Sequence, residues 1–289
     1  MKEKTILITG ANSGIGRVAT MELAKLGANI IMVCRNEEKA KAVQDDINAV
    51  TGLNNVDLFI ADMSSHKSIK AFAKAFYKKY DQLDVLINNA GMIVDKLEYN
   101  DAGIEMTMAT NHFGYFYMCH YMLPALKKSP NARIVNVASL AHRLTPYPSD
   151  NLNADKSFGF FKQYSVSKLC NVLFSKKLSE ILKNNTNITV NSLHPGNIAS
   201  NFGKAGGNWF GSLIRNFNFV LTTPQKGAET IIYLAASPLV QNKTGLYWYK
   251  KNPVIPAVDA IQSDNAQHLW DWSLEKSGIK VYGEFDLED

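Results

Sequence analysis

A glycine-rich turn near the start of the chain has residue types and spacing suited to holding a phosphate. The β-branched run Thr5–Thr9 leads into TGANSGIG (residues 9–16), and a helical pattern follows. Glycines let backbone N–H groups approach a pyrophosphate closely, and a helix N-terminus adds partial positive charge. An ordinary strand-to-helix turn would also contain glycines, so the pattern alone leaves both interpretations open. The residues predicted to bind phosphate are Gly10, Asn12, Ser13, Gly14, Ile15 and Gly16.

Two arginines lie where the adenosine ribose of a bound dinucleotide is expected. Arg35 follows the second β-branched run, at a position where NAD-specific sites usually carry an acid, and Arg17 directly follows Gly16. A guanidinium group is a planar fork of donors that matches a phosphate. We therefore predict NADP(H) as the cofactor. The alternative is that both arginines are ordinary surface residues.

Asp62 ends the third β-branched run, in the triplet Ala-Asp-Met. Its carboxylate could accept a hydrogen bond from an adenine amino group, while the backbone of Asp62 and Met63 lines the ring. Aspartate at a strand–helix junction is also a routine helix N-cap. Both interpretations stay open at this point.

The elements that would position these residues alternate along the chain. Parallel strands that are buried on both faces have continuous apolar runs, and strands that alternate with helices indicate βαβ units. The predicted strands are Thr5–Thr9, Asn29–Cys34, Val56–Ile60, Val85–Asn88, Arg133–Ala138, Ile188–Leu193 and, more weakly, Thr244–Tyr249. The predicted helical segments are Gly16–Leu26, Glu37–Ala49, Lys67–Tyr80, Gly103–Lys127, Ser165–Lys183 and Pro224–Ala236. We predict an α/β, Rossmann-type doubly wound, mostly parallel sheet of about seven strands in three layers, forming a single domain over residues 1–289.

Composition and charge argue against several classes of protein. The chain has 289 residues, 46% hydrophobic and 20% charged, with 31 basic and 26 acidic residues. The basic residues are scattered rather than gathered in a stripe, so we expect no nucleic-acid partner. The three cysteines lack CxxC spacing, and His112, His142 and His194 lack a carboxylate or cysteine partner at metal-ligand spacing. We therefore expect no metal and no disulfide framework.

The sequence also indicates the cellular compartment in which the protein is expected. The N-terminus leads straight into a strand without the apolar core of a signal peptide, so we expect a cytoplasmic protein. The stretch Met106–Leu126 has no Asp, Glu, Lys or Arg, but it contains Asn111, two histidines and a proline. We expect no membrane span from it, although its length would suffice.

Three motifs in this order, TGANSGIG, NNAG (88–91) and YSVSK (164–168), resemble the short-chain dehydrogenase/reductase family over nearly the whole chain. The segments VCRNEEKA, TNHFGYFYM, VNVASLAHR, LHPGNIASN and TPQKGAETIIYLA are similar to the retinol dehydrogenase branch. The resemblance implies an NADP(H)-dependent oxidoreductase that interconverts a carbonyl and its alcohol, acting on a small-molecule substrate. It also implies a homo-oligomer as one arrangement, through the helices that carry Asn111 and Tyr164.

The catalytic residues implied by this resemblance are Asn111, Ser139, Tyr164 and Lys168. Tyr164 would be the proton donor in reduction and the base in oxidation. Lys168 lies four residues later, so the two side chains share a helix face, and its charge would lower the Tyr164 pKa. Lys168 and Tyr164 would also contact the nicotinamide ribose. Ser139 would donate to the substrate oxygen, and Asn111 would hold a water near Lys168.

The remaining cofactor contacts also rest on the resemblance. Asn88 and Ala90 would act mainly through the backbone, and Pro195-Gly196 would border the nicotinamide. The residues expected to contact the cofactor in this half of the chain are Asn88, Ala90, Gly91, Pro195, Gly196, Ile198 and Ser200. The family often has threonine where this chain has Ser200, and the hydroxyl is kept.

Two features of the sequence concern the substrate. The interval from Ser139 to Tyr164 is 25 residues, longer than in many family members, and the intervening segment would border the pocket. A segment rich in aromatic and aliphatic residues at about 200–223 corresponds to the family's substrate lid. It would suit a hydrophobic aldehyde or ketone, such as a retinal-like compound, or contact with a membrane surface. The alternative is that these residues simply pack a short helix onto the core. The branch often begins with a hydrophobic anchor, which we do not find, so an integral membrane enzyme is not expected.

Two other functions were weighed against the enzyme. A non-catalytic protein that senses NADPH or acts as a scaffold on the same fold would normally have a damaged catalytic set, and all four residues are present here. A serine hydrolase that uses Ser139 would need a G-x-S-x-G elbow, which does not surround this serine.

Overall fold

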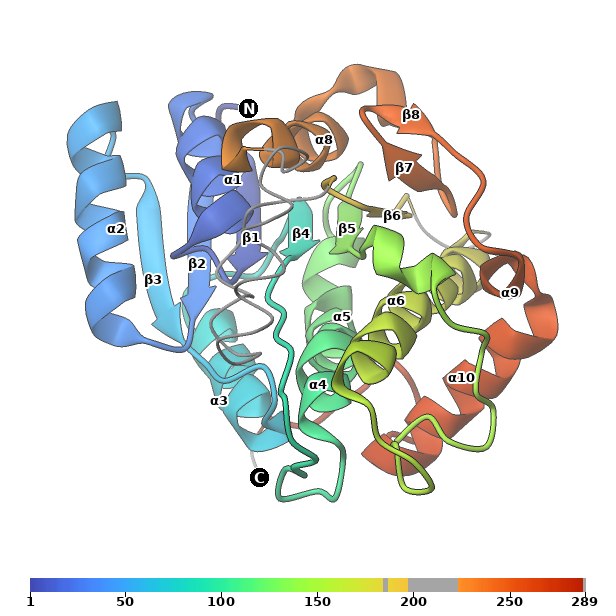
Figure 1. Cartoon of the computed structure of the whole chain (residues 1–289). Coiled ribbons are helices and arrows are strands. Elements are labelled where there is room, and N and C mark those ends of the chain that lie inside the picture. The colour runs from blue at the N-terminus through green and yellow to red at the C-terminus, as the bar shows by residue number, and fades with distance from the viewer. Residues whose placement is uncertain (184–186, 197–222, 288–289) are drawn as a thin grey trace.

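The computed structural model describes residues 1–183, 187–196 and 223–287. Its described strands form one sheet in the order β3-β2-β1-β4-β5-β6-β7-β8, so the chain winds outward in both directions from β1 (Figure 1). All neighbouring pairs are parallel except β7 with β8. The bounds are β1 (Thr5–Thr9), β2 (Asn29–Cys34), β3 (Val56–Ile60), β4 (Val85–Asn88), β5 (Arg133–Val137), β6 (Thr189–Leu193), β7 (Tyr247–Tyr249) and β8 (Asn252–Pro253).

Helices cover both faces of the sheet, which makes the three layers that the sequence predicts. One face is covered by α1 (Gly14–Lys25), α2 (Glu37–Thr51) and α8 (Pro224–Ala236), and the other by α3 (His66–Tyr77), α5 (Gly114–Lys127) and α6 (Phe160–Leu182). The shorter elements are α4 (Met106–Met108), the π-helix η1 (Ala109–Phe113), the 3-10 helices η2 (Leu140–Arg143) and η5 (Pro238–Val240), and α9 (Val258–Ile261). The last helix, α10 (Ser263–Ser277), packs against α6.

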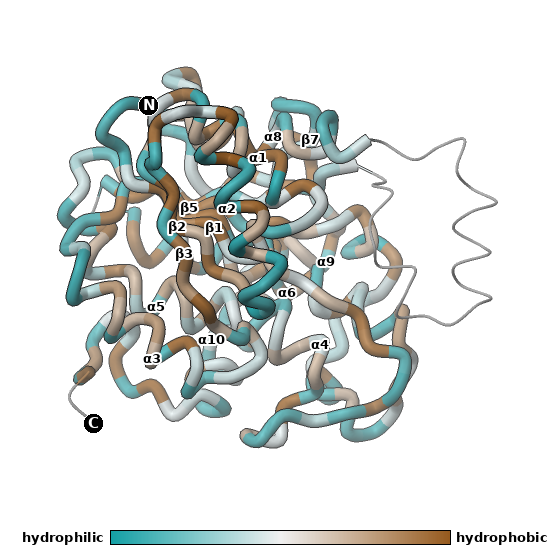
Figure 2. Tube along the Cα trace, turned by 90° about the vertical axis from the view of Figure 1, so that its left-hand side faces the viewer, coloured by the Kyte–Doolittle hydropathy of each residue, from teal (hydrophilic) through white to brown (hydrophobic). Residues whose placement is uncertain are grey.

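The sheet separates two hydrophobic cores. Along β1, Leu7 faces the core under α3, α5 and α6, whereas Ile6 and Ile8 face the core under α1, α2 and α8. Figure 2 shows the strands as hydrophobic segments at the centre of the molecule. Each fully buried aliphatic side chain stabilises the fold by about 1.5–3 kcal/mol relative to exposure. Burial on both faces explains why the strands read as continuous apolar runs rather than alternating ones.

The strand order changes direction at β1, because its neighbours β2 and β4 lead away from it on opposite sides. In open α/β sheets, ligands bind beyond the carboxyl ends of the strands at such a switch point. The glycine turn follows β1, the NNAG motif begins in β4, and Ser139 comes shortly after β5. None of the helices within the described residues is both long and apolar enough to cross a bilayer.

Asp84, directly before β4, links the start of β4 to the start of β1 through hydrogen bonds. Its carboxylate is 2% exposed and accepts hydrogen bonds from Lys4 Nζ (2.9 Å), Thr5 N (2.9 Å) and Ser129 Oγ (2.7 Å). Burial alone would raise its pKa, but these hydrogen bonds and the Lys4 charge outweigh burial, so the pKa lies below its usual value. Because the pKa is lower in the folded chain than in the unfolded one, ionised Asp84 stabilises the fold above the unfolded-state pKa.

We expect Asp84→Asn to lower the free energy of unfolding by about 1–3 kcal/mol at neutral pH, since the amide cannot satisfy all three donors. The difference from the unsubstituted protein should shrink as the pH falls toward the depressed pKa, where the carboxyl group is itself protonated. Urea unfolding at neutral and acid pH measures this. Asp81→Asn is the matched control, because that side chain is 85% exposed, and an equal loss in both variants would contradict the account.

Candidate active site

The glycine turn is held by the end of β4. The Thr9 hydroxyl oxygen accepts from the backbone N–H groups of Asn89 and Ala90, both at 3.0 Å. The Asn89 amide in turn donates to the carbonyls of Thr9 (2.9 Å) and Gly10 (3.2 Å). The turn is therefore shaped by the protein itself. Sequence reasoning missed Thr9 and Asn89; the doubled asparagine of the NNAG motif was the available signal, and we assigned a contact only to its first member.

Glycine is required at two positions of the turn because other backbone atoms approach it. Gly10 has φ of +66°, and a Cβ there would lie 2.9 Å from Ala90 Cα. A Cβ on Gly16 would lie 2.3 Å from the Gly10 carbonyl oxygen and 2.5 Å from Asn89 Nδ2. This close packing leaves the N-terminus of α1 at the surface, where the Ser13 side chain makes no capping hydrogen bond. The first amides of α1 can therefore receive a phosphate.

The two arginines lie beside this turn but differ in their surroundings. Gly10 N donates to the Val33 carbonyl (2.8 Å), which brings the end of β2, and with it Arg35, next to the turn. Arg35 is exposed. Arg17 is half-exposed and forms an ion pair with Asp46 of α2 at 2.7 Å. A 2′-phosphate would have to compete with Asp46 for Arg17, so Arg35 is the better placed of the two.

Asp62 does not cap α3. The N-cap is Ser65, whose hydroxyl accepts from Ser68 N at 3.2 Å, so the capping interpretation of Asp62 is wrong. Asp62 Oδ1 instead accepts from the backbone N–H (2.9 Å) and hydroxyl (2.7 Å) of Ser64. Met63 is 6% exposed and its side chain belongs to the core, while the backbone N–H of Asp62 donates to Ser68 Oγ at 2.9 Å.

Ser139, Tyr164 and Lys168 lie together beyond the end of β5. Lys168, on α6, is buried, and its Nζ donates to the Val137 carbonyl at 3.0 Å. The same Nζ lies 5.8 Å from the centre of the Tyr164 ring. Ser139 precedes η2 and is hydrogen-bonded through its side chain to Tyr164. The one-turn spacing on the helix and the carbonyl at the strand end thus bring an ammonium, a phenol and a hydroxyl into one group.

Burial shifts the acid–base properties of this group in a direction that we did not expect. It raises the pKa of the Tyr164 phenol, against the lowering effect of the Ser139 hydrogen bond, whereas we predicted a lowered pKa. It also lowers the pKa of the Lys168 ammonium to about 7. The prediction assumed a full positive charge beside the phenol. Because burial lowers the pKa of Lys168, the positive charge is only partly present near neutral pH. Its Nζ also donates to the Val137 carbonyl rather than to the phenol.

Asn111 lies in the π-helix η1, between α4 and α5, and its side chain is fully committed to protein atoms. Its Oδ1 accepts from Met92 N (2.8 Å), while Nδ2 donates to the Met92 carbonyl and to Ser167 Oγ, both at 2.9 Å. Ser167 Oγ donates to the Tyr164 carbonyl, so Asn111 is connected to α6. A Cβ on Gly91 would lie 3.2 Å from Asn111 Oδ1 and 3.4 Å from Lys168 Nζ. Asn111 and Lys168 therefore both lie beside Gly91, and any role of Asn111 in holding water would fall to its backbone.

Some of the other predicted cofactor contacts lie within the described residues and some lie outside them. The Asn88 side chain is fully buried and donates to Asn136 Oδ1 (2.8 Å) and Cys119 Sγ (3.3 Å), so a contact from Asn88 to a ligand would have to come from its backbone. Gly196, after β6, has φ of +92° and its N–H donates to His194 Nδ1 at 3.2 Å, which fixes the turn after Pro195. The predicted contacts Ile198 and Ser200 lie outside the described residues, as does the predicted lid except for its last residue.

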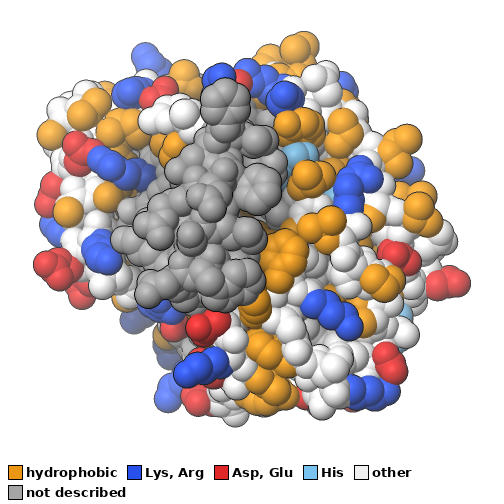
Figure 3. Space-filling view, in the orientation of Figure 1, with side chains coloured by type: hydrophobic (Ala, Val, Ile, Leu, Met, Phe, Trp, Pro, Cys, Tyr) orange, Lys and Arg blue, Asp and Glu red, His pale blue; other side chains and the backbone are white. Residues whose placement is uncertain are grey.

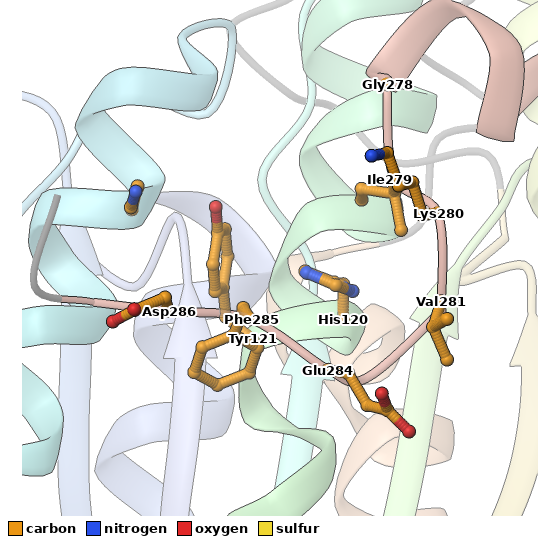
Figure 4. Close-up of a pocket in the computed structure, with 10 residues that line it drawn as sticks. His120, Tyr121, Gly278, Ile279, Lys280, Val281, Glu284, Phe285 and Asp286 are labelled. Atoms are coloured by element: carbon orange, nitrogen blue, oxygen red, sulfur yellow. The ribbon is translucent and has the colours of Figure 1, made fainter.

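A separate cavity lies between the C-terminal segment, α3 and α5 (Figure 4). Its volume is about 400 Å³, and Figure 4 shows Phe285 beside Tyr121 with His120 close to the same segment. None of the predicted site residues lines it.

Among the residues that the structure describes, no three His, Cys, Asp or Glu side chains are grouped so as to hold a metal ion.

Comparisons with known proteins agree with the fold and the motifs. A family model described as short chain dehydrogenase matches residues 4–209. Retinol dehydrogenase 11 of Homo sapiens is 36% identical over 280 residues, covering 96% of this chain and 87% of that protein. A solved structure of an uncharacterized Mycobacterium paratuberculosis protein has a TM-score of 0.78 and 27% identity, covering 96% of this chain and 94% of the other.

A second solved structure carries a cofactor. It is a short chain dehydrogenase from Shigella flexneri 2a complexed with NADP, with a TM-score of 0.69 and 25% identity, covering 87% of this chain and 98% of the other. The residues 4–209 that the family model matches include the glycine turn, the NNAG motif and the YSVSK motif. This chain therefore belongs to the short-chain dehydrogenase family, in its retinol dehydrogenase-like branch, and is an oxidoreductase of alcohol and carbonyl groups.

Proposed function

We propose that the protein uses NADP(H) to interconvert a hydrophobic aldehyde or ketone and its alcohol, with Tyr164 as the acid–base group. The observation that carries the proposal is the meeting of Ser139, Tyr164 and Lys168 beyond β5, beside a glycine turn preshaped to receive a dinucleotide phosphate. When bound, the nicotinamide supplies or takes up the hydride. Sites at this edge of such a sheet hold the dinucleotide across the switch point.

The protein's own residues would manage the proton. Ser139 donates to the substrate carbonyl oxygen and orients it, and the Tyr164 phenol gives a proton to the oxygen as alkoxide charge develops. The raised pKa of Tyr164 keeps the phenol protonated at neutral pH, which favours its work as an acid in carbonyl reduction. Lys168, with a pKa of about 7 and its Nζ 5.8 Å from the centre of the Tyr164 ring, is a second group near the phenol that can exchange a proton near neutral pH. Asn111 fixes the helix on which both residues lie, through Ser167.

The preference for NADP(H) rests on Arg35 beside the glycine turn, and a related structure holds NADP. We expect Arg35→Asp to raise the KM for NADPH by about 10–100-fold, the range of a lost charge-assisted phosphate contact, while leaving the KM for NADH unchanged or lower. Steady-state kinetics with each cofactor measures this. Arg17→Asp should shift the ratio less, because Arg17 already pairs with Asp46; a larger shift in that variant would assign the phosphate to Arg17.

The proposed substrate is apolar because exposed hydrophobic side chains adjoin the catalytic group. Leu140, beside Ser139, is 41% exposed, and Leu144 is 65% exposed. Phe161 is 40% exposed, with its ring centre 6.4 Å from that of Tyr164. Figure 3 shows that hydrophobic side chains gather on this face, where acidic and basic side chains are interspersed. Exposed apolar side chains beside a catalytic group favour an apolar substrate.

A substrate panel tests the proposal. Small polar and bulky apolar aldehydes and ketones are offered with NADPH and with NADH in parallel, after cofactor binding has been measured by NADPH fluorescence. We expect NADPH oxidation with apolar carbonyls. NADPH binding without oxidation by any member would favour a non-catalytic protein, and turnover of small polar carbonyls alone would contradict the substrate class.

A further inference from the structure

His142 makes two hydrogen bonds that connect Ser139 to a distant part of the chain. It is fully buried in η2, three residues after Ser139. Its Nδ1 lies 2.7 Å from the Ser139 carbonyl oxygen, and its Nε2 accepts from the backbone N–H of Ala257 at 3.0 Å. Ala257 lies between β8 and α9, 115 residues along the chain from His142. The imidazole ring thus bridges the peptide of Ser139 and this C-terminal segment.

The two partners determine the state of the ring. A backbone N–H can only donate, so Nε2 of His142 must be unprotonated toward Ala257. A neutral ring then carries its hydrogen on Nδ1, which donates to the Ser139 carbonyl. Burial lowers the pKa of His142 to about 4, and the charge of Arg143 acts in the same direction, although the Ser139 carbonyl opposes it. The Tyr247 hydroxyl, 3.4 Å from Nδ1, and the ring of His194 beyond it are the other titratable neighbours.

The next residue attaches the same segment a second time. Arg143 Nη2 donates to the carbonyl of Ile255, two residues before Ala257. The segment would otherwise be weakly held, since Ile255 is 79% exposed and Val258 is 71% exposed. Two consecutive residues of η2 therefore hold residues 255–257 against the 3-10 turn that begins at Ser139.

We infer that His142 is a positioning residue for Ser139: it donates to the Ser139 carbonyl and, held in place by Ala257, sets the direction of the Ser139 hydroxyl. The inference rests on the proposed role of Ser139 in orienting the substrate oxygen. Rotation of the Ser139 peptide would move the hydroxyl away from both Tyr164 and the substrate. Misplacement of a catalytic group by about 1 Å can cost two orders of magnitude in rate.

Two substitutions separate the two hydrogen bonds. In His142→Asn, the amide nitrogen takes the position of Nδ1 and can still donate to the Ser139 carbonyl. In His142→Gln, the longer side chain reaches the position of Nε2 and can accept from Ala257, but the side-chain donor to Ser139 is lost and only the backbone N–H of residue 142, at 3.2 Å, still donates to that carbonyl. We expect His142→Gln to lower kcat by about tenfold with an unchanged KM for NADPH, and His142→Asn to recover most of that loss. A purely structural role would affect stability and NADPH binding without this difference in kcat.

A double-mutant cycle with Ser139→Ala distinguishes a positioning role of His142 from a purely structural one. If His142 acts through Ser139, His142→Gln should have little further effect on the residual rate of Ser139→Ala. An equal loss of kcat in both backgrounds would overturn the positioning role, as would a wild-type kcat for His142→Gln while Ser139→Ala is inactive. A fully active Ser139→Ala variant is a different result, because it would refute the proposed role of Ser139 and the inference that rests on it.

Discussion

Replacing Tyr164 with phenylalanine should lower kcat by about 10²–10⁴-fold, the usual contribution of a general acid, and should leave NADPH binding intact. The phenol is the group at the site that can give a proton to an oxygen held by Ser139, and its ring can stay in place without the hydroxyl. Steady-state kinetics and NADPH fluorescence titration measure the two effects separately.

Tyr77→Phe is the matched control for this substitution. It also removes one phenolic hydroxyl, which donates to the Tyr121 carbonyl at 2.7 Å, but Tyr77 lies on α3 and outside the proposed site. We expect a small loss of stability and an unchanged kcat. If Tyr164→Phe retained more than about a tenth of the wild-type kcat, Tyr164 would not be the general acid.

Replacing Gly16 with alanine should weaken NADPH binding by at least about tenfold and lower the free energy of unfolding by about 1–3 kcal/mol, as overpacking does. The added methyl group would lie 2.3 Å from the Gly10 carbonyl oxygen, and a backbone atom cannot turn aside as the end of a side chain can. The glycine turn must then open, which moves the first amides of α1 away from the phosphate. Fluorescence titration and urea unfolding report the two changes.

Gly159→Ala provides the comparison. Its Cβ would meet only Lys162 Cβ, at an ordinary contact distance of 3.7 Å, and its backbone is extended, with φ of −152°. We expect little change in NADPH affinity or stability. Equal affinities for NADPH in the unsubstituted protein and in Gly16→Ala would show that the turn does not hold the cofactor.

The positions of most strands could be predicted from the sequence because the central runs, such as β2 and β4, are buried on both faces and read as continuous apolar segments. The runs from Thr5–Thr9 to Val85–Asn88 coincide with β1 to β4. The eighth strand, β8, is missing from the prediction because it is two residues long, and no periodicity can be recognised in Asn252–Pro253. The π-helix around Asn111 was also missed, since its five residues continue the apolar pattern of the helices on either side.

The structure places Ser139, Tyr164 and Lys168 together, but their interactions differ from those expected. Motif order brought Ser139, Tyr164 and Lys168 together in advance, but burial depends on packing that no motif contains. The raised pKa of Tyr164 and the lowered pKa of Lys168 follow from that packing. Likewise, the supports of the site come from residues remote in sequence, such as Ala257 beside His142, and spacing along the chain could not indicate them.

The most direct test of the proposed function follows a labelled hydride. The protein is incubated with NADPH that carries deuterium at both positions of the hydride-donating nicotinamide carbon and with an apolar aldehyde that the panel identifies, and formation of the alcohol is followed by mass spectrometry. We expect an alcohol that carries one deuterium on the former carbonyl carbon, formed at least about 100-fold faster by the unsubstituted protein than by Tyr164→Phe. Alcohol without deuterium, or labelled alcohol formed at the same rate by both proteins, would contradict this mechanism.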